Sequence, residues 1–223
     1  MAQGIVAVIP IRSFSDGKTR LSHLLSPLER RRLIEEMFER VVSAVRASGA
    51  VARIGIVSPD SEVLSASGRM GNNVFAIRQD PGRPGLNEAA NLGREWAGSI
   101  GADAMLVLFG DLPLITPADV QSLVRRDAPV VIATDRHGAG TNGLMLRLGG
   151  ASGGQAFRFS YGPASRRGHV EGGDRLGLEQ ITAIGIGTAF DLDTVDDLER
   201  LEATNEALPA VRAIDRLSRE QTA

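Results

Sequence analysis

Ala104-Met-Leu-Val-Leu-Phe109, followed by Gly110-Asp111-Leu112-Pro113, is the stretch of this chain that decides its fold. Six consecutive apolar residues predict a strand that is buried on both faces, and in a mixed fold such a strand is central and parallel to its neighbours. Asp111 follows at the carboxyl end of that strand, which is where open α/β sheets bind their ligands. Asp111 is therefore a candidate functional residue, and a turn aspartate that bonds its own backbone is the alternative.

Strand and helix signals alternate on both sides of this stretch. Ser26 and Glu29 form a capping-box pattern that opens a helix ending near Gly49. The other helices are predicted at 61–69, 88–100, 116–126 and 194–203, and the other strands at 4–10, 53–58, 74–77, 128–134, 143–148 and 182–186. The glycine-rich segment 149–173 interrupts the rhythm, with a short helix expected near 155–159. The alternation predicts an α/β fold with a mostly parallel central sheet and helices on both faces.

Composition narrows the classes of function. The 223 residues include 25 basic and 27 acidic side chains, and this balance gives no electrostatic footprint for nucleic acid or an anionic membrane. The absence of cysteine excludes thiol catalysis and thiolate metal sites, and no apolar segment approaches membrane-spanning length. We expect a cytoplasmic protein without nucleic-acid or membrane partners. One domain is predicted over 1–205, with a charged tail over 206–223 that could form a surface helix; no pattern fixes the oligomeric state.

Two literal motif matches do not fit their usual context. Gly17-Lys18-Thr19 is the end of a phosphate-binding P-loop, but Arg12 stands where that motif needs its first glycine. The segment 138–143 matches the dinucleotide fingerprint G-x-G-x-x-G, yet the residues that follow, 144–148, have the pattern of a strand rather than a helix. A P-loop ATPase and an NAD-dependent enzyme are therefore both disfavoured.

Loops near the carboxyl edge of the predicted sheet carry the remaining polar candidates. Arg12, Lys18 and Arg20 follow the first strand and form either an anion-binding loop or a solvated basic one. Pro84-Gly85-Leu86-Asn87 ends in an amide that could pair with the edge of a heterocycle or cap a helix.

Asp191 and Asp193 form the last of these loops. Alternate residues of an extended segment share a face, so the two carboxylates are expected to point the same way. Like charges at that spacing favour a bound cation, and hard oxygen ligands suit Mg²⁺. Acidic residues stabilised by the dipole at the start of a helix are the alternative.

Taken in order, these segments resemble the guanylyltransferases of coenzyme F(420) biosynthesis, which join GTP to a small phosphorylated three-carbon acid. The resemblance runs from about Ile5 to Leu201. The motifs that carry it are Ile9-Pro-Ile-Arg12, Lys18-Thr-Arg-Leu21, Gly85-Leu-Asn87, Gly110-Asp-Leu-Pro113, Asp135-Arg-His-Gly-Ala-Gly-Thr-Asn142, Tyr161-Gly-Pro-Ala-Ser165 with His169, and Asp191-Leu-Asp193.

The resemblance implies a fold and a set of site residues. The fold is the nucleotidyltransferase variant of the Rossmann-like α/β sandwich. Asp111, Asp191 and Asp193 match the magnesium-binding aspartates. Positions that hold the acceptor are matched by Thr141, Gly162 and Ser165. The nucleotide-binding positions are matched by Arg12, Lys18, Gly85 and Asn87. The catalytic positions are matched by Lys18, Arg20 and Asp111. Of these, the two cations Lys18 and Arg20 are expected to face the triphosphate.

Four positions depart from the family pattern, and one of them is Tyr161, where phenylalanine is commoner. Arg12 stands where lysine is common, which keeps the charge and changes the geometry. Gly143 replaces a commoner alanine. Ala164 replaces glycine, and it would be strained if that position needs a positive φ.

The implied reaction is attack of the acceptor phosphate on the α-phosphorus of GTP, with release of pyrophosphate. A phosphate monoester is mostly dianionic at pH 7, so the attack needs no general base. Lys18 and Arg20 would stabilise the leaving pyrophosphate, and His169 could touch the acceptor or serve the structure.

Several functions stay open from the sequence alone. Phosphoenolpyruvate is the favoured acceptor, with 2-phospho-L-lactate and 3-phosphoglycerate as alternatives. A nucleotidyltransferase for a sugar phosphate or a pterin cofactor, a metal-dependent glycosyltransferase, and a non-catalytic nucleotide-binding protein are the rival classes.

Overall fold

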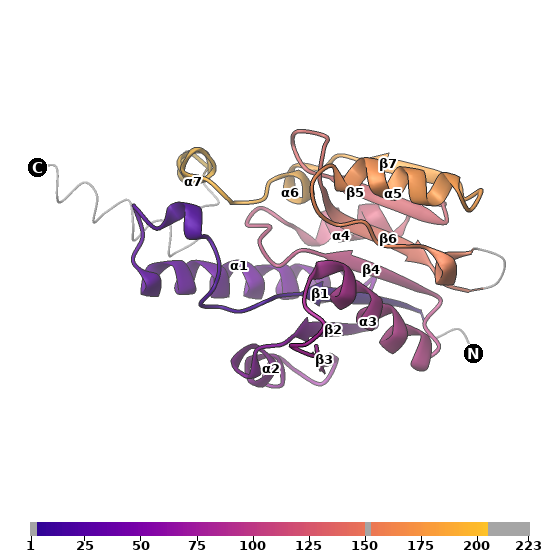
Figure 1. The fold of residues 1–223 in the computed structure, drawn as a ribbon, viewed down its shortest axis with the longest axis horizontal. Coiled ribbons are helices and arrows are strands. Elements are labelled where there is room, and N and C mark those ends of the chain that lie inside the picture. The colour runs from indigo at the N-terminus through magenta and orange to yellow at the C-terminus, as the bar shows by residue number, and fades with distance from the viewer. Residues whose placement is uncertain (1–3, 150–152, 205–223) are drawn as a thin grey trace, which may run out of the picture.

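A computed structural model describes residues 4–149 and 153–204 and places all their strands in one seven-stranded sheet. The strand order is β3-β2-β1-β4-β6-β5-β7, which Figure 1 shows from bottom to top. The predicted α/β sheet is thereby confirmed. The strands are β1 (Ile5–Pro10), β2 (Arg53–Ser58), β3 (Val74–Arg78), β4 (Ala104–Leu108), β5 (Val130–Thr134), β6 (Thr141–Arg147) and β7 (Gln180–Ala183).

Strand β4 is central, as its sequence predicts, and every one of its residues is buried. It pairs in parallel with β1 and antiparallel with β6. Only β6 runs against the other strands, because six residues join it to β5 and a parallel return needs a crossover of a dozen residues or more.

Helices cover both faces of the sheet, and the alternation of side chains along β1 separates two apolar cores. Ala7 and Ile9 face a core shared with helices α1 (Pro27–Ala47), α2 (Ser61–Ser67), α4 (Pro117–Val124) and α7 (Val195–Glu202). Val6 and Val8 face the opposite core, which is closed by α3 (Leu86–Ser99) and by aromatic residues that precede α5 (Ser165–Asp174). The two cores thus bring strands and helices from distant parts of the sequence together beneath the loops at the sheet edge.

The predicted helix starts are confirmed where side-chain caps mark them. Ser26 and Glu29 form the capping box of α1. Thr116 and Thr194 open α4 and α7 with the same reciprocal arrangement. Because the cap of α7 begins at Thr194, Asp191 and Asp193 lie just outside that helix, in the segment that follows the short helix α6 (Ile186–Ala189).

The structure differs from the sequence prediction in the glycine-rich segment. Helix α5 was not predicted, because its ten residues include three glycines and no side chain caps its first turn. The short helix expected near 155–159 is a 3₁₀ turn, η3 (Gly154–Ala156). The last strand ends at Ala183 rather than Ile186, which belongs to α6.

The predicted tail over 206–223 lies outside the described residues. Within 4–149 and 153–204, no helix combines the length and apolar character that crossing a bilayer requires.

Candidate functional site

Three segments meet at the carboxyl ends of β1 and β4. The backbone N–H of Leu192 donates to the carbonyl of Asp111 over 3.4 Å, which joins the loop after β4 to the segment before α7. The Nζ of Lys18, in the loop after β1, lies 2.6 Å from Oδ2 of Asp111 and 2.8 Å from Oδ1 of Asp193. Figure 1 shows the connection from α6 to α7 on the same side of the sheet as the loop after β1. The structure therefore brings the predicted cation and two predicted aspartates together.

Lys18 is held among carboxylates rather than directed into solvent. Only 7% of its side chain is exposed, and its backbone is left-handed, with φ of 54°. Burial alone would lower the pKa of this ammonium, but the charges of Asp111 and Asp193 and their hydrogen bonds outweigh it and raise the pKa above its ordinary value. It is also the only lysine in a chain with 25 Lys and Arg residues.

Asp191 adds a third carboxyl to the cluster. Burial and the nearby charge of Asp111 raise the pKa of its carboxyl. The side-chain nitrogen of Asn142 donates to the carbonyl of Thr188 over 3.0 Å and lies 3.4 Å from Oδ1 of Asp191. Asn142 is thus a residue of the site to which sequence reasoning gave no role. In the sequence, an asparagine directly before the apolar residues of a predicted strand is the signal that could have found it.

The carboxylates of the cluster are of the chemical kind that binds divalent cations. Among the described residues, no group of three or more acidic or histidine side chains has the spacing of a complete metal cage. Oδ1 of Asp111, however, is buried without a hydrogen-bond partner, and Asp191 lies near enough for the two charges to interact. Mg²⁺ is commonly bound by one or two carboxylates, with waters and phosphates as its other ligands. The magnesium roles of Asp111, Asp191 and Asp193 stay predictions.

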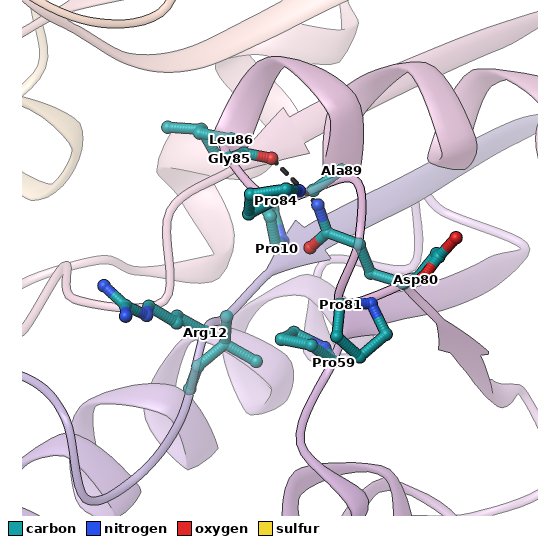
Figure 2. A pocket seen from close by; sticks show the side chains of 11 residues that line it. Pro10, Arg12, Pro59, Asp80, Pro81, Pro84, Gly85, Leu86 and Ala89 are labelled. Atoms are coloured by element: carbon teal, nitrogen blue, oxygen red, sulfur yellow. Dashed lines mark hydrogen bonds between the residues drawn. The ribbon is translucent and has the colours of Figure 1, made fainter.

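Two adjoining cavities lie beside this cluster. The smaller, of about 230 Å³, is lined by Lys18, Asp111 and Asp193. The larger, of about 620 Å³, is formed mainly by apolar residues, and Figure 2 shows proline rings on its walls. Pro10, Ile11 and Arg12 line both cavities, so a single ligand can reach from the carboxylates into the apolar space.

The predicted nucleotide-binding residues are distributed unevenly around these cavities. Gly85 lines the larger one and precedes α3 with φ of 105°, a value that favours glycine. Asn87 lines neither; its side-chain nitrogen donates to the carbonyl of Tyr161 over 3.0 Å, and its oxygen accepts from the N–H of Tyr161 over 2.7 Å. Arg20 is exposed and lines neither cavity. The base-contacting role of Asn87 and the catalytic role of Arg20 stay predictions.

Two of the predicted acceptor residues, Thr141 and Ser165, are associated with the buried His169. Ser165 begins α5, and His169 on that helix contacts Oγ1 of Thr141 through Nδ1 over 3.0 Å. Nε2 of His169 accepts from the backbone N–H of Ser160 over 2.9 Å. Because a backbone N–H can only donate, the proton of the neutral ring is on Nδ1, and it is donated to Thr141. The hydroxyl proton of Thr141 is then directed elsewhere.

The acceptor segment is also tied to the end of β4. The rings of Tyr161 and Phe109 pack with their centroids 5.4 Å apart, and Phe109 directly precedes Gly110 and Asp111. Gly162 follows Tyr161 with φ of 135°. The segment that contains Gly162 is therefore packed against the strand end that carries Asp111.

Ala164 adopts a left-handed backbone conformation, in which an alanine is strained and a glycine is not. Its φ is 54°, in the left-handed region. We expect Ala164→Gly to raise the free energy of unfolding by about 0.5–1 kcal/mol, because a left-handed L-residue costs about 1–2 kcal/mol and the more flexible unfolded chain offsets part of the gain. Urea unfolding measures this change. Ala47→Gly, in the last turn of α1, is the matched control and should have the opposite sign.

His169 makes stability depend on pH. It has no exposed surface, and burial lowers its pKa from 6.5 to about 4. Since the unfolded chain binds the proton first, stability is full above pH 6.5 and falls by about 2–3 kcal/mol as the pH drops to 4.5. Urea titrations at pH 7.5 and 4.5 should show a smaller loss for His169→Asn than for the wild type. His23→Asn, at an exposed histidine, should retain the wild-type slope.

Comparison with known proteins agrees with this geometry. A nucleotidyltransferase from Methanothermobacter thermautotrophicus shares the fold, with a TM-score of 0.62, 21% identity and coverage of 90% of this chain and 96% of that one. A cytidylyltransferase from Leptospira borgpetersenii gives a TM-score of 0.55 at 14% identity, covering 98% and 95%. The chain thus has the α/β fold of these two solved transferases.

Sequence relatives narrow this class. The family described as CofC-like guanylyl transferases matches residues 5–206, and the chain belongs to that family. A phosphoenolpyruvate guanylyltransferase from Rubrobacter xylanophilus is 40% identical over 90% of this chain and 94% of its own length. A 2-phospho-L-lactate guanylyltransferase from Methanothermobacter thermautotrophicus is 31% identical over 86% and 81%. The predicted family and enzyme class are confirmed, and the P-loop, NAD and glycosyltransferase interpretations are set aside.

Proposed function

We propose that this enzyme transfers GMP from GTP to the phosphate of phosphoenolpyruvate and releases pyrophosphate, as a step in coenzyme F(420) biosynthesis in the cytoplasm. The observation that carries the proposal is the cluster of Lys18, Asp111, Asp191 and Asp193 beside two joined cavities. Relatives named phosphoenolpyruvate guanylyltransferase, from 28% to 40% identical, support this acceptor over 2-phospho-L-lactate.

The proposed chemistry is an in-line displacement. An oxygen of the acceptor phosphate forms a bond to the α-phosphorus of GTP while the bond from that phosphorus to the β-phosphate oxygen breaks. Mg²⁺, when bound, neutralises the charge that develops on the phosphates. Asp111 and Asp191 would hold the ion, and Asp193 keeps Lys18 beside it.

The other residues of the site orient the reactants. The dianionic acceptor needs no general base, and within the described residues no histidine or glutamate lines the smaller cavity. Thr141, with its hydroxyl proton left free by His169, can donate to an acceptor oxygen. Catalysis then rests on positioning and on charge neutralisation.

A pyrophosphate-release assay with GTP and Mg²⁺ tests the proposal. Phosphoenolpyruvate, 2-phospho-L-lactate and 3-phosphoglycerate are compared at matched concentrations, and phosphoenolpyruvate should give the highest kcat/KM. Mass spectrometry of the product should show guanosine joined to the acid through two phosphates, one from GTP and one from the acceptor. Release of pyrophosphate only with a sugar 1-phosphate, or with none of the three acids, would contradict the proposal.

A further inference from the structure

Gln79 lies at the end of β3 with its amide orientation fixed by the protein. Its side chain lines the larger cavity, and the residue is only 5% exposed. Nε2 donates to the carbonyl of Arg83 and to the carbonyl of Gly85, each over 3.0 Å, and Figure 2 draws the second bond as a dashed line. Carbonyl oxygens can only accept, so the nitrogen must face them and Oε1 must face away. Gln79 therefore offers an acceptor and no donor.

The neighbouring polar group is also an acceptor. Asp80 lines the same cavity, and its Oδ1 already accepts from the N–H of Gly82 over 2.8 Å, which fixes the carboxylate in the turn. Apart from Arg12, the remaining walls are apolar, with the rings of Pro59, Pro81 and Pro84 labelled in Figure 2. An apolar space with fixed acceptors suits a flat heterocycle that carries hydrogen-bond donors on its edge.

The connection between the two cavities indicates which part of a nucleotide fits the larger one. The smaller cavity holds the carboxylate–ammonium cluster and is suited to phosphates and a metal ion. Arg12 lines both cavities and gives a cation where they join. The phosphates therefore belong in the smaller cavity, and the base belongs in the larger one.

We propose that Oε1 of Gln79 accepts a hydrogen bond from the Watson–Crick edge of guanine, which makes Gln79 a residue that selects the purine base. This inference rests on the proposed use of GTP. Guanine offers two adjacent donors on that edge, N1–H and the 2-amino group, whereas adenine has one donor there, the 6-amino group, and its N1 is an acceptor. Adenine would place that acceptor near the fixed oxygen of Gln79 and leave both unpaired, which is how a polar site rejects an analogue.

The dissociation constants of GTP and ATP, measured with Mg²⁺ by titration calorimetry, test the proposal. The wild type should bind GTP more tightly than ATP. Gln79→Met removes the acceptor and should reduce the ratio of the two constants at least tenfold. Gln79→Glu loses the bonds to the loop but keeps acceptor oxygens, so it should retain the preference for GTP.

A third variant controls for loosening of the loop. Arg83 pairs with Glu88 over 2.7 Å at the surface and does not line the cavity. Arg83→Gln should weaken GTP and ATP by the same factor. A ratio that changes less than threefold in Gln79→Met, or an equal loss of preference in Gln79→Met and Gln79→Glu, would overturn the proposal. Because binding needs no acceptor acid, these results are independent of the pyrophosphate assay that tests the reaction.

Discussion

Asp111→Asn is expected to lower the rate of nucleotidyl transfer by about 100- to 1,000-fold, the usual effect of removing one group that stabilises developing charge. Oδ1 of Asp111 is buried without a partner, and Oδ2 accepts from Lys18. An asparagine keeps the shape and loses the negative charge that a metal ion requires. Steady-state pyrophosphate release at several Mg²⁺ concentrations measures the loss, and raising Mg²⁺ should not recover it.

The same variant should stay folded, which separates a chemical role from a structural one. Lys18 still has Asp193 at 2.8 Å, so its ammonium keeps one counter-charge. Asp60→Asn is the matched control, because Asp60 caps α2 and lines neither cavity, and asparagine caps helices equally well. That control should retain wild-type turnover. Near-normal turnover of Asp111→Asn at saturating Mg²⁺ would exclude the metal role.

Asp111 could be located from the sequence because the information is local. The apolar residues before it predict a buried central strand. Open α/β sheets bind their ligands at the carboxyl ends of such strands, which makes the aspartate there a candidate. The capped starts of α1, α4 and α7 were found for the same reason. Helix α5 was missed because its glycines lower the intrinsic helix propensity of the segment. Packing against the sheet stabilises the helix instead, and that contact cannot be inferred from the local sequence.

The partners of the site residues could not be predicted, because they depend on contacts between distant segments. The loop after β1 could be identified as basic, but Lys18 finds its counter-charges 93 and 175 positions away. Asn87 was a candidate for the base and instead holds the backbone of Tyr161, 74 positions along the chain. Gln79 has no motif around it, and only its two backbone partners show which way its oxygen points.

The strain at Ala164 depends on a backbone angle that the sequence does not give. Ala164 was expected to be strained only if its position needs a positive φ, and its φ is 54°. The resemblance to a family could identify the unusual residue, but the backbone angle comes from three-dimensional structure alone.

Lys18→Met is expected to destabilise the protein in the absence of Mg²⁺ and to abolish most turnover. Removing the ammonium leaves Asp111 and Asp193 without their shared counter-charge, beside the nearby Asp191. Breaking a fully buried pair costs about 3–5 kcal/mol, and we expect about 2 kcal/mol here because Asp193 is half exposed and solvent screens it. For a chain of this size that corresponds to a fall in Tm of about 4–8 °C, measured by calorimetry in EDTA.

Added Mg²⁺ should then stabilise Lys18→Met more than it stabilises the wild type. In the wild type the ammonium already neutralises part of the cluster, so the ion gains less by entering. In the variant the carboxylates repel one another until a cation binds, and binding to the folded state alone raises Tm. An equal Mg²⁺-dependent rise in both proteins would contradict this interpretation.

Lys18→Arg provides the matched comparison, because it keeps the charge and changes its shape. All the remaining Lys and Arg residues of the chain are arginines. The single lysine therefore indicates that a compact ammonium is needed at this position, where its Nζ lies 2.6 and 2.8 Å from two carboxylate oxygens. A planar guanidinium spreads its charge over a larger group. Lys18→Arg should therefore recover much of the stability lost in Lys18→Met while turnover stays low, and full recovery of turnover would show that only the charge of Lys18 matters.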